Sequence, residues 1–423
     1  MTKIIAAVKT FLNSTNRRSW AWFAVLSLAA LALRFCFAPL PGNGYDMGAF
    51  SYWATRSRHF AFFGFYSFFD YPRLSFPNYA LYFPILAVMG EAAQVATAAG
   101  RVLLKMPAIL GDVFLAGAVF ASAKPRWKLA AAAFVLFNPA VWYVSAVFGQ
   151  TDCLHAAFMV LAVLFATKNK YRCAWASLAI AVFFKIQAIS ILPLIVALNF
   201  KSSGFKKMTV EIVPATVLTA AMTIPYLIVS SSAVIWRSFR GSFGMFPMVS
   251  INAWNPWYLL TLFGRGDWVY DTVKVAGISY KTIGLVAFAV AAGLIIAALP
   301  KRPGRTVVFA AAAAMCLAFF MLPTEMHERY SYPFIPFIAV IFCESPFVVG
   351  AAVLASLVIF LDINFVQKIP VINFSFVNAF GGCLGWTLVF IGLFIAYFAW
   401  YLRRAHAEKQ VEAAAAPPRP TGA

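Results

Sequence analysis

The chain has 423 residues, of which 63% are apolar and only 11% are charged, and its mean hydropathy is +0.81. Because a soluble domain carries roughly 25% charged residues, this composition excludes a secreted or cytosolic enzyme and a disulfide-stapled module. Apolar runs of about 18 residues or more recur along the chain, and each can cross the roughly 30 Å core of a bilayer. The sequence therefore predicts an all-α polytopic membrane protein embedded in the lipid bilayer.

The charge balance is strongly basic, with 34 Lys and Arg against 14 Asp and Glu and a net charge of +20. The basic residues form short clusters between apolar stretches, which is typical of membrane topology rather than of nucleic-acid binding. We therefore expect no nucleic-acid partner. The clusters are Lys3/Lys9/Arg17/Arg18, Lys124/Arg126/Lys128, Lys168/Lys170/Arg172, Lys201/Lys206/Lys207, Lys301/Arg302/Arg305 and Arg403/Arg404/Lys409/Arg419.

If these clusters face the cytoplasm, the positive-inside rule predicts about twelve transmembrane helices with both termini inside. Residues 78–98 are also apolar enough to span, but a crossing there would place every later cluster outside. We therefore expect a shallow or re-entrant hairpin at 78–98. The predicted spans are 20–40, 104–122, 129–147, 153–168, 172–184, 187–199, 208–230, 281–299, 306–322, 331–343, 346–363 and 381–402.

This topology divides the chain into regions. Residues 1–19 form a cytoplasmic N-terminus, and the module 20–330 includes two long outer loops, 41–103 and 231–280. Further transmembrane helices follow at 331–402. Residues 403–423 are expected to form a disordered cytoplasmic tail, since the tail ends in a low-complexity stretch rich in Ala and Pro.

In chain order, the first polar residues that need an explanation lie in the first outer loop. Asp46 follows a Gly/Pro turn and precedes an aromatic-rich helical stretch, so it can cap that helix, accept a proton at the membrane mouth, or do both. Asp70 and Arg73 lie within the aromatic segment 68–83, which suits the membrane interface. These two can form a local ion pair of little energetic weight.

Further polar residues interrupt the apolar stretches that follow. Asp112 lies inside the second span and can pair with a cation across the bundle. Gln150 and Asp152 are expected at the outer mouth of a helix, where charged groups usually face a cavity or a partner. Lys185 and Gln187 break an apolar hairpin, and a lysine there must reach water, a carboxylate or a phosphate.

The densest polar cluster is 323–330, PTEMHERY, between two apolar spans. His327, Glu328 and Arg329 suit the orientation of a phosphate or a sugar. A HExxH zinc helix is excluded because the second histidine is missing, and the chain has only 4 histidines. We expect no metal site and no cofactor, although a divalent cation held by carboxylates stays open.

Taken in order, the motifs GYDMGAFSYWA, DYPR, KMPAILGD, FNPAVWYVSAVFGQTD, FFKIQ, SINAWNPW and MHERY resemble those of bacterial GT-C-fold glycosyltransferases. That group is similar to GPI mannosyltransferase II and, more distantly, to the dolichyl-phosphate-glucose-dependent glucosyltransferases. The motifs cover residues 44–330. The resemblance implies a GT-C-like bundle with a large first outer loop, in which 20–330 is the catalytic module.

The resemblance further implies inverting transfer of a hexose, with mannose favoured, from a polyprenyl-phosphate-linked donor to an envelope glycolipid or glycan. The site would face the periplasm or exterior of a bacterial inner membrane. Asp46 would be the catalytic base. The expected donor-phosphate-binding residues are His327, Arg329, Lys185 and Arg73, and the expected sugar- or acceptor-binding residues are Asp70, Gln150, Asp152, Gln187, Glu328, Asn252 and Trp254.

Other classes of protein stay open at this stage. A transporter or lipid-linked sugar flippase is the main alternative, but such proteins usually place ionisable residues near the bilayer midplane, often between internal repeats. A structural subunit of an envelope assembly, or a polymerase or ligase acting on lipid-linked oligosaccharides, are further alternatives. The gathering of polar residues at one predicted face favours an enzyme.

Overall fold

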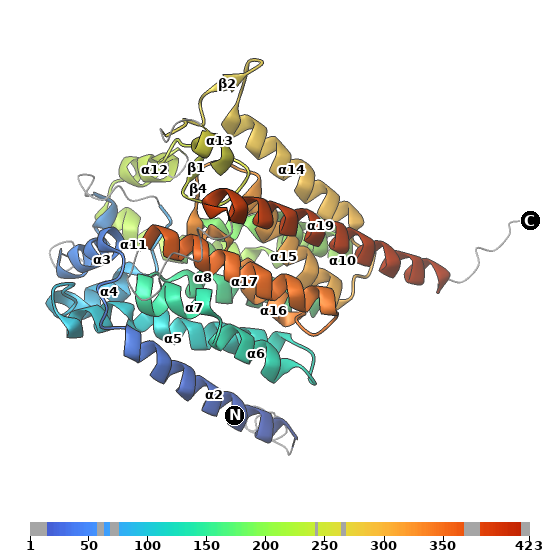
Figure 1. Cartoon of the computed structure of the whole chain (residues 1–423), viewed down its shortest axis with the longest axis horizontal. Helices are drawn as coiled ribbons and strands as arrows, with labels where there is room; N and C mark the ends of the chain where they lie inside the picture. Colours follow the sequence, from blue (N-terminus) through green and yellow to red (C-terminus); the bar gives the residue numbers. More distant parts are fainter. Residues whose placement is uncertain are drawn as a thin grey trace, which may run out of the picture.

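The computed structural model describes residues 15–56, 63–67, 76–241, 244–263, 268–367 and 381–415. These residues are almost entirely helical, with four strands of only two residues each (Figure 1). The predicted all-α class is therefore confirmed for this part of the chain. The main helices are α2 Thr15–Phe37, α5 Ala98–Ser122, α6 Lys128–Leu136, α7 Pro139–Trp142, α8 Asp152–Thr167, α9 Tyr171–Phe184, α10 Leu192–Glu211, α11 Val213–Val229, α14 Tyr280–Ala298, α15 Arg305–Met321, α16 Phe334–Val340, α17 Pro346–Gln367 and α19 Gly382–Ala414.

Within the described residues, 6 helices are long and apolar enough to cross a membrane, or 7 if the bent pair α6 and α7–η4 counts as one span. This supports a multi-pass membrane protein, but it does not reach the predicted number of about twelve crossings. The difference arises because α8, α9 and α15 are apolar but shorter than 18 residues. One of the six spans is the joined helix Ile186–Val229, whose backbone leaves the helical conformation at Gly204 (φ 69°, ψ 171°).

The two predicted outer loops contain short elements. The first holds α3 (Gly44–Arg56), η2 (Phe65–Ser67), α4 (Phe83–Met89) and η3 (Gly90–Ala92). Because seven helical residues reach only about 10 Å, α4 by itself is too short to cross a bilayer. The hairpin expected at 78–98 stays a prediction. The second loop holds α12 (Ser232–Gly241), β1 (Ser250–Ile251), α13 (Tyr258–Phe263), β2 (Lys274–Val275) and β3 (Ile278–Ser279).

The C-terminal helix corrects one boundary. α19 continues to Ala414, so residues 403–414, which were expected to be disordered, are helical. Its last turns carry two acids that accept backbone N–H groups from the loop between α14 and α15: Glu412 accepts from Lys301 and Arg302, and Glu408 accepts from Gly304. These contacts attach the end of α19 to the bundle, which explains why the helix persists.

The described residues of the basic clusters gather at one end of the bundle. Lys124 pairs with Glu344 (2.7 Å) just before α17 begins, and the last residue of α17, Gln367, bonds Asn43 beside α3. The 22 residues of α17 separate these two contacts by about 33 Å. Figure 1 likewise shows α3 and α4 at the end of the bundle opposite the C-terminus. The outer-loop helices and the basic clusters therefore lie at opposite ends.

A buried ion pair joins two of the helices. Arg34 on α2 contacts Asp112 on α5 at 2.6 Å, and both side chains are fully buried. Ser145 also donates to the Asp112 carboxylate, and Arg34 donates to the carbonyl of Leu136. The expectation that Asp112 pairs with a cation across the bundle is confirmed.

Candidate active site

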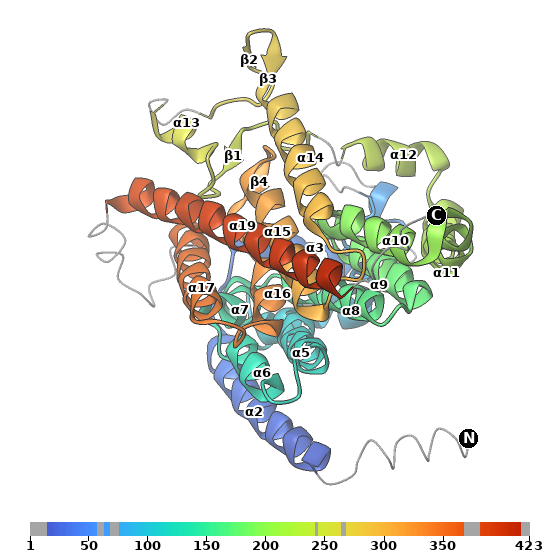
Figure 2. The ribbon, with the colours of Figure 1, turned by 90° about the vertical axis from the view of Figure 1, so that its right-hand side faces the viewer.

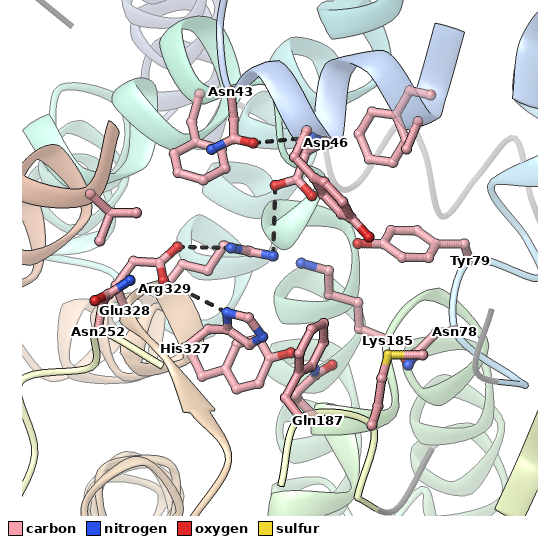
Figure 3. Close-up of a pocket in the computed structure, with 18 of the residues that line it drawn as sticks. Asn43, Asp46, Asn78, Tyr79, Lys185, Gln187, Asn252, His327, Glu328 and Arg329 are labelled. Carbon is pink, nitrogen blue, oxygen red and sulfur yellow. Dashed lines mark hydrogen bonds and ion pairs between the residues drawn. The ribbon is translucent and has the colours of Figure 1, made fainter. Parts of the chain in front are cut away.

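A cavity of about 390 Å³ lies at the outer-loop end of the bundle. Segments far apart in the sequence meet there: α3, the break after α9, the segment after β1, β4 (Met326–His327) and the 3-10 turn η6 (Glu328–Ser331) (Figure 3). Most of its wall area is apolar. Its polar lining residues are Asn43, Asp46, Asn78, Lys185, Gln187, Asn252, His327, Glu328 and Arg329, with Tyr45, Tyr79 and Tyr330.

Asp46 enters the cavity from the first turn of α3. The cap of this helix is provided by Asn43, whose side-chain oxygen accepts the N–H of Asp46 at 3.0 Å. The reading of Asp46 as the helix cap is therefore wrong, and its carboxylate is left to face the cavity. There it lies 3.7 Å from a terminal nitrogen of Arg329.

Arg329 occupies the centre of the charged cluster in Figure 3. One terminal nitrogen donates to Glu328 at 2.8 Å, and the guanidinium lies over the Phe148 ring at 5.3 Å. Its buried Nε has no hydrogen-bond partner among the described residues. Since buried polar atoms are normally paired, this donor suits an anionic or polar ligand.

Lys185 is positioned by a break in the chain. It has extended backbone (φ −152°, ψ 130°) between the end of α9 and the 3-10 helix η5 (Ile186–Ile191). Its amine donates to Asp152 at 2.7 Å and lies 5.9 Å from the centre of the Tyr79 ring. At this break the Lys185 side chain reaches the Asp152 carboxylate at the start of α8, so that the two charged groups pair between the apolar helices α8 and α9.

Gln150 and Asp152 lie behind the cavity wall rather than in its lining. Both are buried, and the Tyr79 hydroxyl donates to Gln150 at 3.4 Å. The π-helix η4 (Tyr143–Phe148) ends at Gly149, whose φ of 94° lies in the left-handed region. A Cβ at Gly149 would clash with the Met47 side chain of α3, so glycine lets α3 approach closely.

The segment after β1 reaches the cavity through a short strand pairing. β1 pairs in parallel with β4, so that Ser250 faces Met326 and Ile251 faces His327. Asn252 forms a further bridge with His327 and lines the cavity. Trp254, two residues later, instead lies fully buried in the core, where its backbone N–H donates to the Asp362 carboxylate at 3.1 Å.

The remaining predicted residues divide into two groups. Gln187 and Glu328 line the cavity beside Lys185 and Arg329. Asp70 and Arg73 lie outside the described residues.

Burial shifts the pKa values of His327 and Glu328. Burial, together with the positive charges of Arg329 and Lys185, holds the pKa of His327 well below its usual range. Burial also raises the pKa of Glu328, although the neighbouring Arg329 opposes this shift. His327 is therefore neutral near pH 7 and contributes a hydrogen bond rather than a positive charge.

Several cavity residues were not predicted as site residues, among them Asn78, Tyr79 and Phe246. The side-chain oxygen of Asn78 accepts the backbone N–H of Ile186 at 2.6 Å. The backbone N–H of Tyr79 (φ 63°) donates to the carbonyl of Phe184. Phe246 meets the His327 ring edge-on, with ring centres 5.1 Å apart. The aromatic run around Tyr79 was interpreted as an interfacial belt, and no pattern in it separates belt residues from cavity residues.

Among the described residues, no group of three or more His, Cys, Asp or Glu side chains is placed to hold a metal ion. The cavity instead offers carboxylates paired with a guanidinium and an amine. Such an arrangement can accept a proton at one point and hold negative charge at another.

Comparison with protein-family models found no match to the chain, and comparison with curated protein sequences found none either. The architecture and the site define a helical protein with several helices long and apolar enough to span a membrane, and with a charged cavity at one end of the bundle.

Proposed function

We propose that the protein is an inverting membrane glycosyltransferase that moves a hexose, with mannose favoured, from a polyprenyl-phosphate-linked donor to an envelope glycolipid or glycan. The observation that carries this proposal is the pairing of Asp46 with Arg329 at 3.7 Å inside a largely apolar cavity at one end of the bundle. A carboxylate and a guanidinium side by side supply the two groups that sugar transfer from a lipid phosphate requires.

In the proposed reaction the acceptor hydroxyl attacks the anomeric carbon from the face opposite the phosphate. The new bond joins the acceptor oxygen to that carbon, and the bond between the carbon and the phosphate oxygen breaks. The bonding electrons leave with the polyprenyl phosphate, and the hydroxyl proton passes to the Asp46 carboxylate. No general acid is needed, because the leaving group is already a phosphate anion.

Positive charge must meet the leaving phosphate. Arg329 and Lys185 supply it, and the unpartnered Nε of Arg329 is a free donor. Neutral His327 adds a hydrogen bond. Gln187 and Asn252 would bind sugar hydroxyls from the cavity wall, while Gln150, Asp152 and Glu328 would hold the two cations and the wall in place.

The proposal includes an orientation. The basic clusters would face the cytoplasm and the cavity the periplasm of a bacterial inner membrane. It also includes a GT-C-like bundle of about twelve crossings, in which the short apolar helices α8, α9, α15 and α16 cross together with the long ones. The break at Gly204, inside α10, would divide the joined helix Ile186–Val229 into two separate passes.

The test offers purified protein in lipid a panel of radiolabelled polyprenyl-phosphate monosaccharides with an envelope-lipid extract as acceptor. Asp46→Asn keeps the shape of the side chain and removes the base, so turnover should fall by on the order of 10²–10⁴. Glu91→Gln is the matched control, because Glu91 is an exposed acid of the same outer loop. This control should leave turnover unchanged.

Full turnover by folded Asp46→Asn protein would reject Asp46 as the base. No transfer from any donor, combined with movement of a labelled lipid-linked sugar across sealed vesicles, would replace the enzyme with a flippase or transporter. The position of the ionisable cluster at one end of the bundle argues against that alternative, since transport sites usually lie near the midplane.

A further inference from the structure

A second polar cavity, of about 400 Å³, lies at the basic end of the bundle, far from the candidate active site. It is formed where the loop between α8 and α9, the middle of α10 and the loop between α14 and α15 meet. Figure 2 shows α10, α14 and the C-terminal part of α19 converging in this part of the molecule. The proposed function uses none of its residues.

The floor and walls of this cavity differ in character. Buried Ala166, Tyr171, Leu198 and Val308 form the floor. The walls are polar and exposed, with two lysines and an arginine among them: Thr167, Asn169, Lys201, Ser202, Lys301 and Arg302. Such a lining suits a compact polar anion.

The cations of the walls are held in place but not neutralised. Lys201 donates to the carbonyl of Leu299 at 3.0 Å, which ties α10 to the loop after α14. Glu412 accepts the backbone N–H groups of Lys301 and Arg302 (2.9 and 3.1 Å). Neither of these two side chains forms an ion pair with any residue that the structure describes.

The start of α9 adds a further positive contribution. α9 begins at Tyr171 in the cavity floor, and no side chain caps its first turn. The free N–H groups at a helix N-terminus favour an anion. Basic pockets between transmembrane helices near the membrane surface bind the head groups of anionic lipids.

We propose that this cavity binds a phosphate group through Lys301 and Arg302, with Lys201, Ser202 and Asn169 as further polar contacts. The phosphate belongs either to the head group of an anionic lipid or to a free phosphate ion. This inference goes beyond the proposed function and does not depend on it, because the two sites share no residue and lie at opposite ends of the bundle.

The test measures binding of phosphatidylglycerol to the purified full chain in neutral detergent by native mass spectrometry, with phosphatidylcholine as the uncharged comparison. Lys301→Gln with Arg302→Gln removes two charge-assisted contacts, so affinity for the tightest-bound phosphatidylglycerol should fall about tenfold or more. Lys206→Gln with Arg404→Gln is the matched control. This control also removes one lysine charge and one arginine charge, but from exposed positions at the same end of the bundle, outside the cavity lining.

A second arm identifies the source of the phosphate. Inorganic phosphate is titrated onto protein in neutral lipid discs, and the unfolding temperature is followed for the same variants. Stabilisation that the cavity variant alone loses assigns the site to a free phosphate, while loss confined to the lipid arm assigns it to a head group. Equal losses in cavity and control variants, or no loss in either arm, would overturn the proposal. Unfolding temperatures in neutral lipid without phosphate show that each variant is folded.

Discussion

At the scale of single residues, the pairing of Lys185 with Asp152 has a measurable energetic consequence. Both side chains are almost fully buried, and their charged atoms lie 2.7 Å apart. Removing one partner of a buried ion pair leaves the other charge uncompensated, which costs about 3–5 kcal/mol. Lys185→Met should therefore lower the unfolding temperature sharply.

The double variant Lys185→Met/Asp152→Asn also removes the Asp152 charge that Lys185→Met leaves unpaired. We expect it to be more stable than Lys185→Met alone, in a double-mutant cycle measured by thermal unfolding in one detergent. Strictly additive effects would show that the two side chains do not interact in the folded protein.

His327 gives a prediction for the pH dependence of stability. Its pKa in the folded protein lies well below the unfolded value of about 6.5. Below about pH 6.5 the unfolded chain binds a proton that the folded protein does not. Stability should therefore fall as the pH falls, by up to about 1.4 kcal/mol per pH unit from this residue.

His327→Gln removes this contribution, so the variant should lose less stability than the parent between about pH 7.5 and 5. The unfolding temperature as a function of pH provides the measurement. His406→Gln, at an exposed position on α19, is the control and should follow the parent curve. A steeper loss of stability at low pH in His327→Gln than in the parent would contradict the assignment of a neutral imidazole.

At the scale of elements, Gly149 controls how closely α3 approaches the end of η4. Alanine there would combine an unfavourable positive φ with a clash against Met47. Since Met47 and Asp46 are neighbours on α3, the clash should move the Asp46 carboxylate. Gly149→Ala should therefore reduce turnover by more than its loss of stability explains.

The companion variant Gly149→Ala/Met47→Ala separates the two effects. Shortening Met47 relieves the clash but leaves the backbone strain, so turnover should partly recover while stability does not. Turnover and unfolding temperature are measured on the same preparations. No recovery of turnover would mean that backbone strain alone, rather than the position of α3, is responsible.

The elements also show what could be predicted from sequence. Charged residues are rare in this chain, so Asp46, Lys185 and the segment 327–329 were recognisable as a set without knowledge of the fold. Their mutual contacts were not, because about two thirds of the chain separates Arg329 from Asp46. Trp254 and Asn252 lie two residues apart, yet one enters the core and the other the cavity. Asn252 is held at the cavity by its bridge to His327, and no local pattern encodes that long-range contact.

At the scale of the whole molecule, the separation of the basic end from the cavity end gives a prediction about sidedness. Glu91 lies exposed in the first outer loop and Ser202 lies exposed beside a basic cluster. In a cysteine-free background, Glu91→Cys and Ser202→Cys should react with a membrane-impermeant maleimide from opposite sides of sealed vesicles. Ser202→Cys should react from the cytoplasmic side.

A permeant maleimide that labels both positions in all vesicles provides the control for reactivity. Labelling of both cysteines from one side would refute the topology. Charge clusters alone do not predict the number of crossings, because helix length also decides which segments can span. α8 and α9 fall short of the usual span length, and the joined helix Ile186–Val229 far exceeds it.

The ion pairs that Lys185 and Arg329 form within the protein would affect how long a phosphate stays bound in the cavity. Lys185 and Arg329 each have a carboxylate of the protein itself within 2.8 Å, at Asp152 and Glu328. Any phosphate that enters must therefore compete with these acids for the same cations. In the proposed reaction these acids would re-form their ion pairs as the polyprenyl phosphate departs. Asp152 and Glu328 would then shorten the time that the phosphate product stays bound, which favours rapid turnover over tight retention.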